Sequence, residues 1–217
     1  PDWVYFIGKF LALALLLVAW MIVLGIAGIV GQAALGYTHF EIGVYARVLL
    51  GLQLTDYLLF ALLALTVHVV VNQKHLGTLA ALALYALIPF APLLGIEHKL
   101  LVFGASPDWS YSDIRGFGAS LLPWAMFKAW WIAWAVLLAV LARLAWVRGR
   151  EWHVGARLQL ARTRLTRPTA TVAALAGIAL LGIGATLFYN TNVLNKYQTQ
   201  DERLGNSAGY ERLSAHY

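Results

Sequence analysis

The chain has 217 residues, of which 61% are hydrophobic and only 12% are charged. A water-soluble domain carries about 25% charged residues, so this composition excludes one, because polar groups could not cover the apolar surface in water. The chain has no cysteine, which excludes a disulfide framework and a thiolate metal site. The formal net charge of +6 is gathered in one segment between apolar runs, a pattern that indicates membrane topology and argues against nucleic acid as a partner.

A helix needs roughly 20 apolar residues to cross the hydrocarbon core of a bilayer, and several runs in the sequence reach this length. No run alternates apolar and polar residues with period two, as a strand of a membrane β-barrel would. The sequence therefore predicts an all-α, polytopic transmembrane bundle with about five spanning helices, at residues 10–31, 50–71, 76–96, 118–142 and 169–194.

Three of these runs contain residues that interrupt the apolar pattern. The second contains His68 near its expected inner end, where helix packing is the ordinary role and a ligand or proton-relay role is the alternative. The third contains Pro89 and Pro92, which predict a kink or break near its end because proline frees backbone carbonyls. The fourth contains Lys128 within a tryptophan cluster. We expect its ammonium to reach the outer interface, with a substrate-facing role as the alternative.

The basic residues set the orientation of the helices. Arginines are concentrated between the fourth and fifth runs, and the positive-inside rule places this segment in the cytoplasm. By alternation, and leaving out intramembrane Lys128, the inside segments carry nine Lys and Arg with two acids, and the outside segments six with eight. The basic segment is either an amphipathic helix at the interface or a simple contact for anionic headgroups. Its candidate contacts for lipid or a partner are Arg148, Arg150, Arg157, Arg162, Arg164 and Arg167.

The expected outer loop between the third and fourth runs alternates turn formers with aromatic residues. An ordered cap or re-entrant element over the bundle and a plain solvated connection both fit this pattern. The candidate residues of the loop are Tyr111, Ser112, Asp113, Gly116 and Gly118. Two pairs of small residues, at positions 27 and 31 and at positions 173 and 177, would allow close helix contacts, and chance occurrence in alanine-rich helices is the alternative. The polar tail at 196–217 is expected to be an extracytoplasmic linker toward a domain outside this chain.

Sequence motifs for catalysis are missing from this chain. It contains no His-Glu-x-x-His metal signature, no Gly-x-x-x-x-Gly-Lys-Ser/Thr phosphate loop and no Gly-x-Ser-x-Gly elbow. Proton transfer and nucleophile activation need ionisable groups, and at membrane depth the sequence offers only His68 and Lys128, which we expect near opposite faces. We therefore expect no catalytic, cofactor-binding or metal-binding residue in this chain.

Four segments carry a resemblance to a known family. They are Gly8-Lys9-Phe10 at the start of the first run, GLQLTDYLLFALLALTVHVVVNQKHLG at 51–77, YSDIRGFG at 111–118 followed by Pro123 and Trp124, and YNTNVLNKY at 189–197. In their order and spacing, these segments resemble the type-2 ABC exporter permeases, and more narrowly the bacterial permeases that are fused to a gluzincin zinc aminopeptidase.

The resemblance implies the C-terminal half of such a permease, in the bacterial cytoplasmic (inner) membrane and as part of a longer chain. Its final helix would lead to a peptidase domain on the outer face. The implied partners, besides the lipid bilayer, are a separate cytoplasmic ABC ATPase subunit and a second permease half or second copy in a homodimer. The alternative is a membrane anchor or scaffold that holds the zinc aminopeptidase domain at the bilayer.

Overall fold

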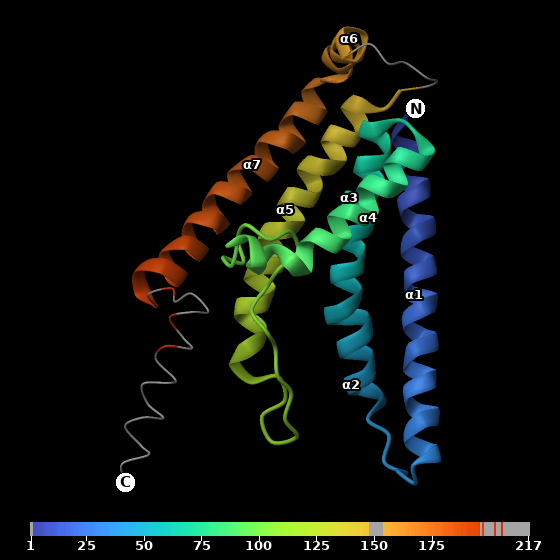
Figure 1. The fold of residues 1–217 in the computed structure, drawn as a ribbon, viewed down its shortest axis with the longest axis vertical. Helices are drawn as coiled ribbons and strands as arrows, with labels where there is room; N and C mark the ends of the chain where they lie inside the picture. Colours follow the sequence, from blue (N-terminus) through green and yellow to red (C-terminus); the bar gives the residue numbers. More distant parts are fainter. Residues whose placement is uncertain (1, 148–153, 196, 198–201, 203–204, 206–217) are drawn as a thin grey trace. The chain divides into compact units, whose positions relative to one another are not determined.

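The structure is a computed structural model that describes residues 2–147, 154–195, 197, 202 and 205. In the described part of the chain the regular secondary structure is helical, apart from one isolated antiparallel bridge between Ser112 and Gly116. Figure 1 shows the α-helices in chain order, which are α1 (Asp2–Ala34), α2 (Ile42–Ala46), α3 (Leu54–Val71), α4 (Lys74–Phe90), α5 (Leu121–Ala145), α6 (Val154–Arg164) and α7 (Arg167–Phe188).

Within the described residues, five helical stretches are long and apolar enough to cross a membrane: Trp3–Ala34, Ile42–Val71, Lys74–Leu94, Gly118–Ala145 and Arg167–Leu194. They correspond one to one with the five runs predicted from the sequence. Many of their large apolar side chains are exposed on the protein surface, among them Leu16 on α1 and Leu181 on α7. Such a surface is unfavourable in water and suits contact with lipid. The chain is a multi-pass helical membrane protein.

The second span begins earlier than the sequence predicted. A π-helical segment, η1 (Arg47–Gln53), joins α2 to α3, so that one helix of 30 residues runs from Ile42 to Val71. Its length is about 45 Å, which exceeds the ~30 Å hydrocarbon core, so at least one end extends into the interface. The predicted span started at residue 50, after Arg47, but one charge does not end a helix.

The third span breaks where its two prolines predicted. Pro89 lies inside the last turn of α4, and after Phe90 the chain continues as a 3-10 turn, η2 (Ala91–Leu94), with Pro92 in its first positions. Gly95 then ends the segment with a positive φ of 75°, a conformation that glycine adopts without strain. The loss of two backbone N–H donors explains why the α-helix does not continue.

The chain divides into two compact units. The first consists of Pro1–Ala86 with Trp131–Gly177, and the second of Leu87–Trp130 with Ile178–Tyr217. Within the first unit, α1 runs alongside the continuous helix of α2 and α3 (Figure 1). The second unit holds the outer loop, the start of α5 and the end of α7 with its π-helical extension η4 (Tyr189–Leu194).

The close helix contacts lie at different glycines from those predicted. A Cβ added to Gly28 would lie 2.9 Å from the ring of Tyr45, and one added to Gly25 would lie 3.3 Å from Leu49, so α1 approaches its neighbour there. No atom lies within 4 Å of a Cβ added to Gly31 or Gly177, the glycines of the two predicted pairs. Spacing finds small residues but not the face that meets a neighbour, so it did not identify the glycines at which α1 is approached.

Candidate functional site

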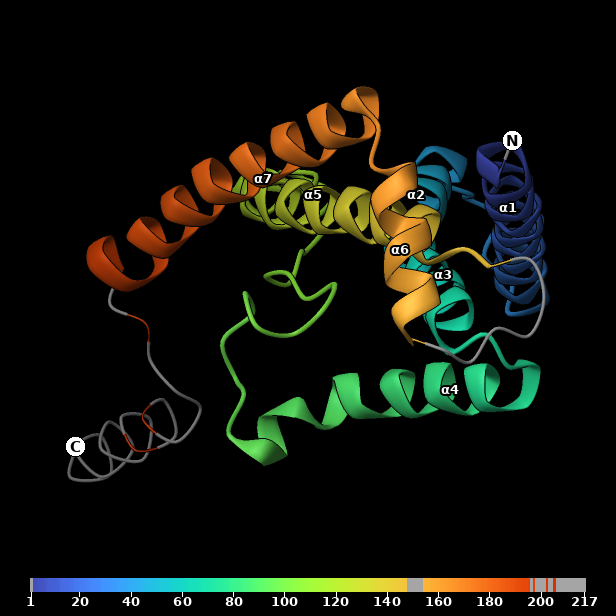
Figure 2. The same ribbon diagram turned by 90° about the horizontal axis from the view of Figure 1, so that it is seen from above.

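The basic segment between the last two spans forms the helix α6, which lies across the ends of α3 and α5 (Figure 2). One face is partly buried and carries Arg157, Leu160, Ala161 and Arg164, which are spaced three, one and three residues apart. This spacing aligns them along one side of a helix. Outside this face, Leu158 is exposed. The helix therefore has a face that packs on the protein and a face that is open to lipid or a partner.

Arg157 connects α6 to two spanning helices at once. Its Nη1 donates a hydrogen bond to the carbonyl of Val70 at 2.9 Å, and its Nη2 donates to the carbonyls of Val69 at 3.1 Å and Ala145 at 3.3 Å. Val69 and Val70 belong to the last turn of α3 and Ala145 is the last residue of α5, where carbonyls have no partner within their own helix. A cation at a helix C-terminus is also favoured by the helix dipole. Arg157 therefore caps both helix ends and links them.

Arg164 and Arg143 extend this network to the next span. Arg164 donates from Nη1 to the carbonyl of Trp146, directly after α5. Arg143, in the last turn of α5, donates to the hydroxyl of Thr169 at 2.5 Å, and its guanidinium lies 5.4 Å from the ring centroid of Trp3. Thr169 is buried at the start of α7. The arginine side chains therefore join α5 to α6, α7 and the start of α1.

The six predicted arginine contacts do not share one environment. Arg157 and Arg164 bond to main-chain carbonyls, whereas Arg162 on α6 and Arg167 at the start of α7 are exposed. Arg148 and Arg150 lie outside the described residues. The sequence analysis assigned no contact role to Arg143. Its position in the last turn of the fourth span could have indicated such a role, because a cation there can bond to helix-end carbonyls and interacts favourably with the helix dipole.

His68 packs against the next helix of the first unit. Its ring nitrogen Nδ1 lies only 2.6 Å from the Cβ position that a side chain at Gly77 would occupy, so the imidazole needs the bare backbone of α4. Asn72, at φ 53°, ends α3 in the left-handed region and donates its N–H to the carbonyl of His68 at 3.0 Å. The tight turn brings α4 back against α3 at this histidine.

Lys128 is covered by the outer loop. Its side chain is only 3% exposed, and its ammonium donates to the carbonyl of Gly104 at 2.5 Å. The ring of Trp124 lies 5.8 Å from the ammonium. We expected this cation to reach the outer interface. It does point into the outer loop, but a loop carbonyl receives it in buried surroundings. Lys128 and His68 belong to different compact units.

The predicted outer-loop motif folds around Phe117. The rings of Trp109 and Tyr111 lie 5.7 and 5.1 Å from that of Phe117, which is 8% exposed. Ser112 and Gly116 exchange two main-chain hydrogen bonds of 2.9 and 2.7 Å around Asp113, which is exposed at the turn. Gly116 and Gly118 have φ values of 58° and 52°. The motif therefore forms a closed turn packed on its own aromatic cluster.

His98, in the loop that follows the third span, has a defined place in the second unit. Its Nδ1 accepts the N–H of Leu100 at 3.2 Å, its Nε2 lies 3.3 Å from the side-chain amide of Asn192, and its ring lies 4.7 Å from that of Tyr197. Burial lowers the pKa of His98 below its usual 6.5, and the hydrogen bond with Asn192 partly offsets this. The contact joins the outer loop to the end of the last span.

Comparison with known proteins gives no relative for this chain. No protein-family model matches it, and no curated protein or solved structure matches it significantly. Among the described residues, no three or more His, Cys, Asp or Glu side chains are grouped so that they could hold a metal ion. We therefore infer what the chain does from its sequence, its helix architecture and the contacts of α6.

Proposed function

We propose that this chain is the membrane-embedded part of an ABC-type exporter permease, which moves a substrate across the membrane together with a separate cytoplasmic ATPase subunit. Two points from the sequence support the proposal: the resemblance of four segments to such permeases and the basic segment that the positive-inside rule places in the cytoplasm. The observation that carries it is the attachment of α6 to the ends of α3 and α5 through Arg157.

This attachment suits a helix that passes movement from a partner to the membrane. The exposed surface of α6 carries Leu158 and Arg162, an apolar and a cationic side chain that a protein partner could contact. On the face that packs on the protein, the planar, forked guanidinium of Arg157 bonds to the ends of two helices. It fixes the orientation of α6 relative to them better than a lysine ammonium would. A displacement of α6 would therefore move α3 and α5 together. In this proposal the chain supplies no catalytic, cofactor or metal residue, and the partner hydrolyses the ATP.

The first test is site-specific cross-linking in native membranes. A photo-reactive amino acid replaces Leu158 on the exposed face of α6, and the matched control carries it at Ser110 in the outer loop. We expect the Leu158 position to yield a cross-link to a protein with a phosphate-binding loop, and the Ser110 position to yield none. Cross-links from Leu158 to lipid alone would contradict the proposal and favour the alternative of an anchor for an outer peptidase.

The second test asks whether α6 transmits movement. The chain is reconstituted with the ATPase that the cross-linking identifies. ATP turnover is then compared for wild type, Arg157→Gln and Arg162→Gln. We expect the Arg157→Gln chain still to form the complex but no longer to stimulate ATP turnover by the partner, because the link from α6 to the helix ends is broken. Arg162→Gln removes the same charge from the exposed face and should instead weaken assembly. Unchanged stimulation in Arg157→Gln would show that α6 does not couple the helices.

A further inference from the structure

A small cavity lies in the first unit at the end of the helices where α3 and α5 stop. Its volume is about 210 Å³, and it is lined by Lys9, Leu65, His68, Val69, Asn72, Trp146 and Val147. Asn72 is the residue that ends α3, and Trp146 and Val147 directly follow α5. The cavity therefore lies at the level where spanning helices end, which is the boundary between the hydrocarbon core and the aqueous phase. The predicted topology places this end in the cytoplasm.

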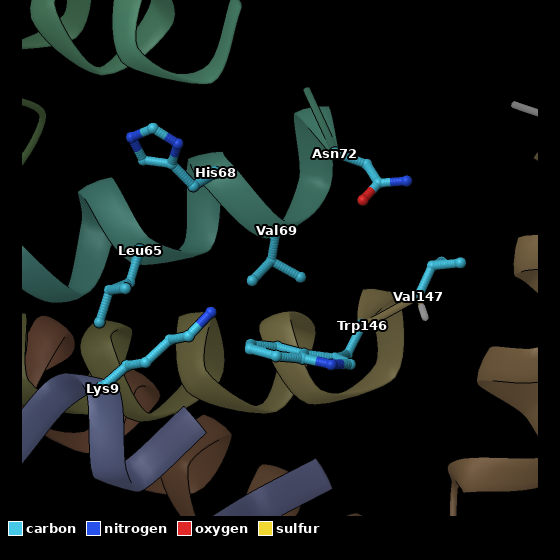
Figure 3. Close-up of a pocket in the computed structure, with 7 residues that line it drawn as sticks. All are labelled: Lys9, Leu65, His68, Val69, Asn72, Trp146 and Val147. Atoms are coloured by element: carbon cyan, nitrogen blue, oxygen red, sulfur yellow. The ribbon is translucent and has the colours of Figure 1, made fainter. Parts of the chain in front are cut away.

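The cavity combines three kinds of surface. Figure 3 shows Leu65 and Val69 of α3 facing Lys9 and the indole of Trp146, while the ring of His68 points away from them. The ammonium of Lys9 lies 5.1 Å from the centroid of the Trp146 ring. Phe6 meets the indole edge to face at 6.4 Å, which holds it in place. One side of the cavity is thus aliphatic, another is aromatic, and a cation and the Asn72 amide supply its polar groups.

The electrostatic surroundings of the cavity are positive. No carboxylate lines it among the residues that the structure describes. Two further cations lie close by: Arg157 bonds to the carbonyl of Val69, and Arg143 lies in the last turn of α5, three residues before Trp146. A negatively charged ligand would therefore find complementary charge here, and a cationic one would be repelled.

We propose that this cavity binds the phosphodiester headgroup of an anionic phospholipid from the cytoplasmic leaflet. Basic pockets between spanning helices on this side of a membrane suit such headgroups. The volume is below the roughly 300 Å³ at which pockets for whole small molecules begin, so it accommodates a headgroup whose acyl chains remain in the bilayer. Leu65 and Val69 contact the glycerol and upper acyl carbons, and Lys9 and Asn72 meet the phosphate oxygens. A soluble anion would leave the aliphatic side without a partner.

Native mass spectrometry of the full chain in detergent tests this assignment, with phosphatidylglycerol as the probe and phosphatidylcholine as the neutral comparison. We expect Lys9→Gln to reduce retention of phosphatidylglycerol about fivefold, the change that one basic residue near the membrane surface produces. Lys74→Gln is the matched control, because Lys74 is an exposed lysine at the same end, at the start of α4, and does not line the cavity. It should leave retention unchanged.

A second variant keeps the test decisive if Lys9→Gln folds poorly. Val69→Phe fills the cavity without changing any charge, and it should also reduce retention of phosphatidylglycerol. Equal losses in Lys9→Gln and Lys74→Gln would mean a general attraction to the membrane surface and would overturn the site. Wild-type retention in Val69→Phe would overturn it as well. Displacement of the lipid by inorganic phosphate would assign the cavity to a soluble anion and overturn the lipid as its ligand.

Discussion

Several cationic side chains among the described residues bond to main-chain carbonyls. Arg157 and Arg164 bond to carbonyls at helix ends, and Lys128 bonds to a carbonyl of the outer loop. At a membrane boundary this arrangement serves two needs together, because an unpaired carbonyl away from water costs free energy and a buried cation needs a partner. Each of these residues therefore connects one element to another.

Replacing Lys128 tests this role at a single residue. In Lys128→Met the carbonyl of Gly104 loses its donor in buried surroundings, which costs about 1–3 kcal/mol. We expect the outer loop to loosen, so that limited proteolysis from the outer side cuts within residues 97–118 faster than in wild type. Arg115→Gln is the control, since Arg115 is an exposed cation on the same loop, and the protease is chymotrypsin, which does not cut at arginine. Equal cutting of the two variants would contradict a structural role for Lys128.

His98 predicts a pH dependence on the outer side. Because its Nδ1 accepts the Leu100 N–H, a protonated ring would lose this bond, and burial already lowers its pKa below 6.5. The unfolded chain then binds a proton more readily than the folded one. The contact contributes fully above pH 6.5, and this stability is lost as pH falls through the lowered folded pKa.

The measurement is thermal unfolding in detergent, followed by tryptophan fluorescence at about pH 8 and about pH 5, which bracket the titration of histidine. We expect wild type to lose more stability on acidification than His98→Phe, in which the titrating group is absent. An equal loss in both proteins would assign the pH dependence to other groups.

At the scale of elements, short segments that depart from regular α-helix decide where the long helices end, continue or connect. The prolines end α4, the π-helical segment η1 carries the second span across Arg47, and the outer loop closes a turn around Phe117. The loop depends on backbone conformations that favour glycine, because a Cβ at positive φ costs roughly 1–2 kcal/mol.

Gly116→Ala tests whether the outer turn is held in its closed form. The φ of 58° strains an alanine at this position, so the pairing of Ser112 with Gly116 should weaken and trypsin should cut after Arg115 more readily. Gly8→Ala is the control, because a Cβ there meets no atom within 4 Å and its φ is not positive. If wild-type protein is already cut at Arg115 as fast as at Arg212 in the tail, the turn is not closed in solution.

At the scale of the whole molecule, the distribution of basic residues predicts the orientation in the membrane. The chain has no native cysteine, so single cysteines can report which side is exposed. We expect a membrane-impermeant maleimide to label Ser207→Cys in intact cells, and Ala156→Cys only after the membrane is permeabilised. Ala156 is exposed on α6, and Ser207 lies outside the described residues. Labelling of Ala156→Cys but not Ser207→Cys in intact cells would reverse the topology.

The sequence by itself determined the membrane class, the five spans and the break at Pro89. These features follow from local composition, since a run of about 20 apolar residues or a missing N–H acts wherever it lies in the chain. The sequence also located the basic segment, but not the direction of its arginines. Whether a charge on a helix turns to lipid or to protein depends on what lies beneath that face.

Only the tertiary structure decided the contacts that carry the functional argument. Arg157 meets Val70, which lies 87 residues earlier in the chain, and no sequence spacing predicts that meeting. In the same way, Gly28 and not Gly31 receives a neighbouring ring, and Lys128 finds the carbonyl of Gly104. The physical reason is the same in each case: an unsatisfied carbonyl or a close backbone approach becomes available only after the helices have packed.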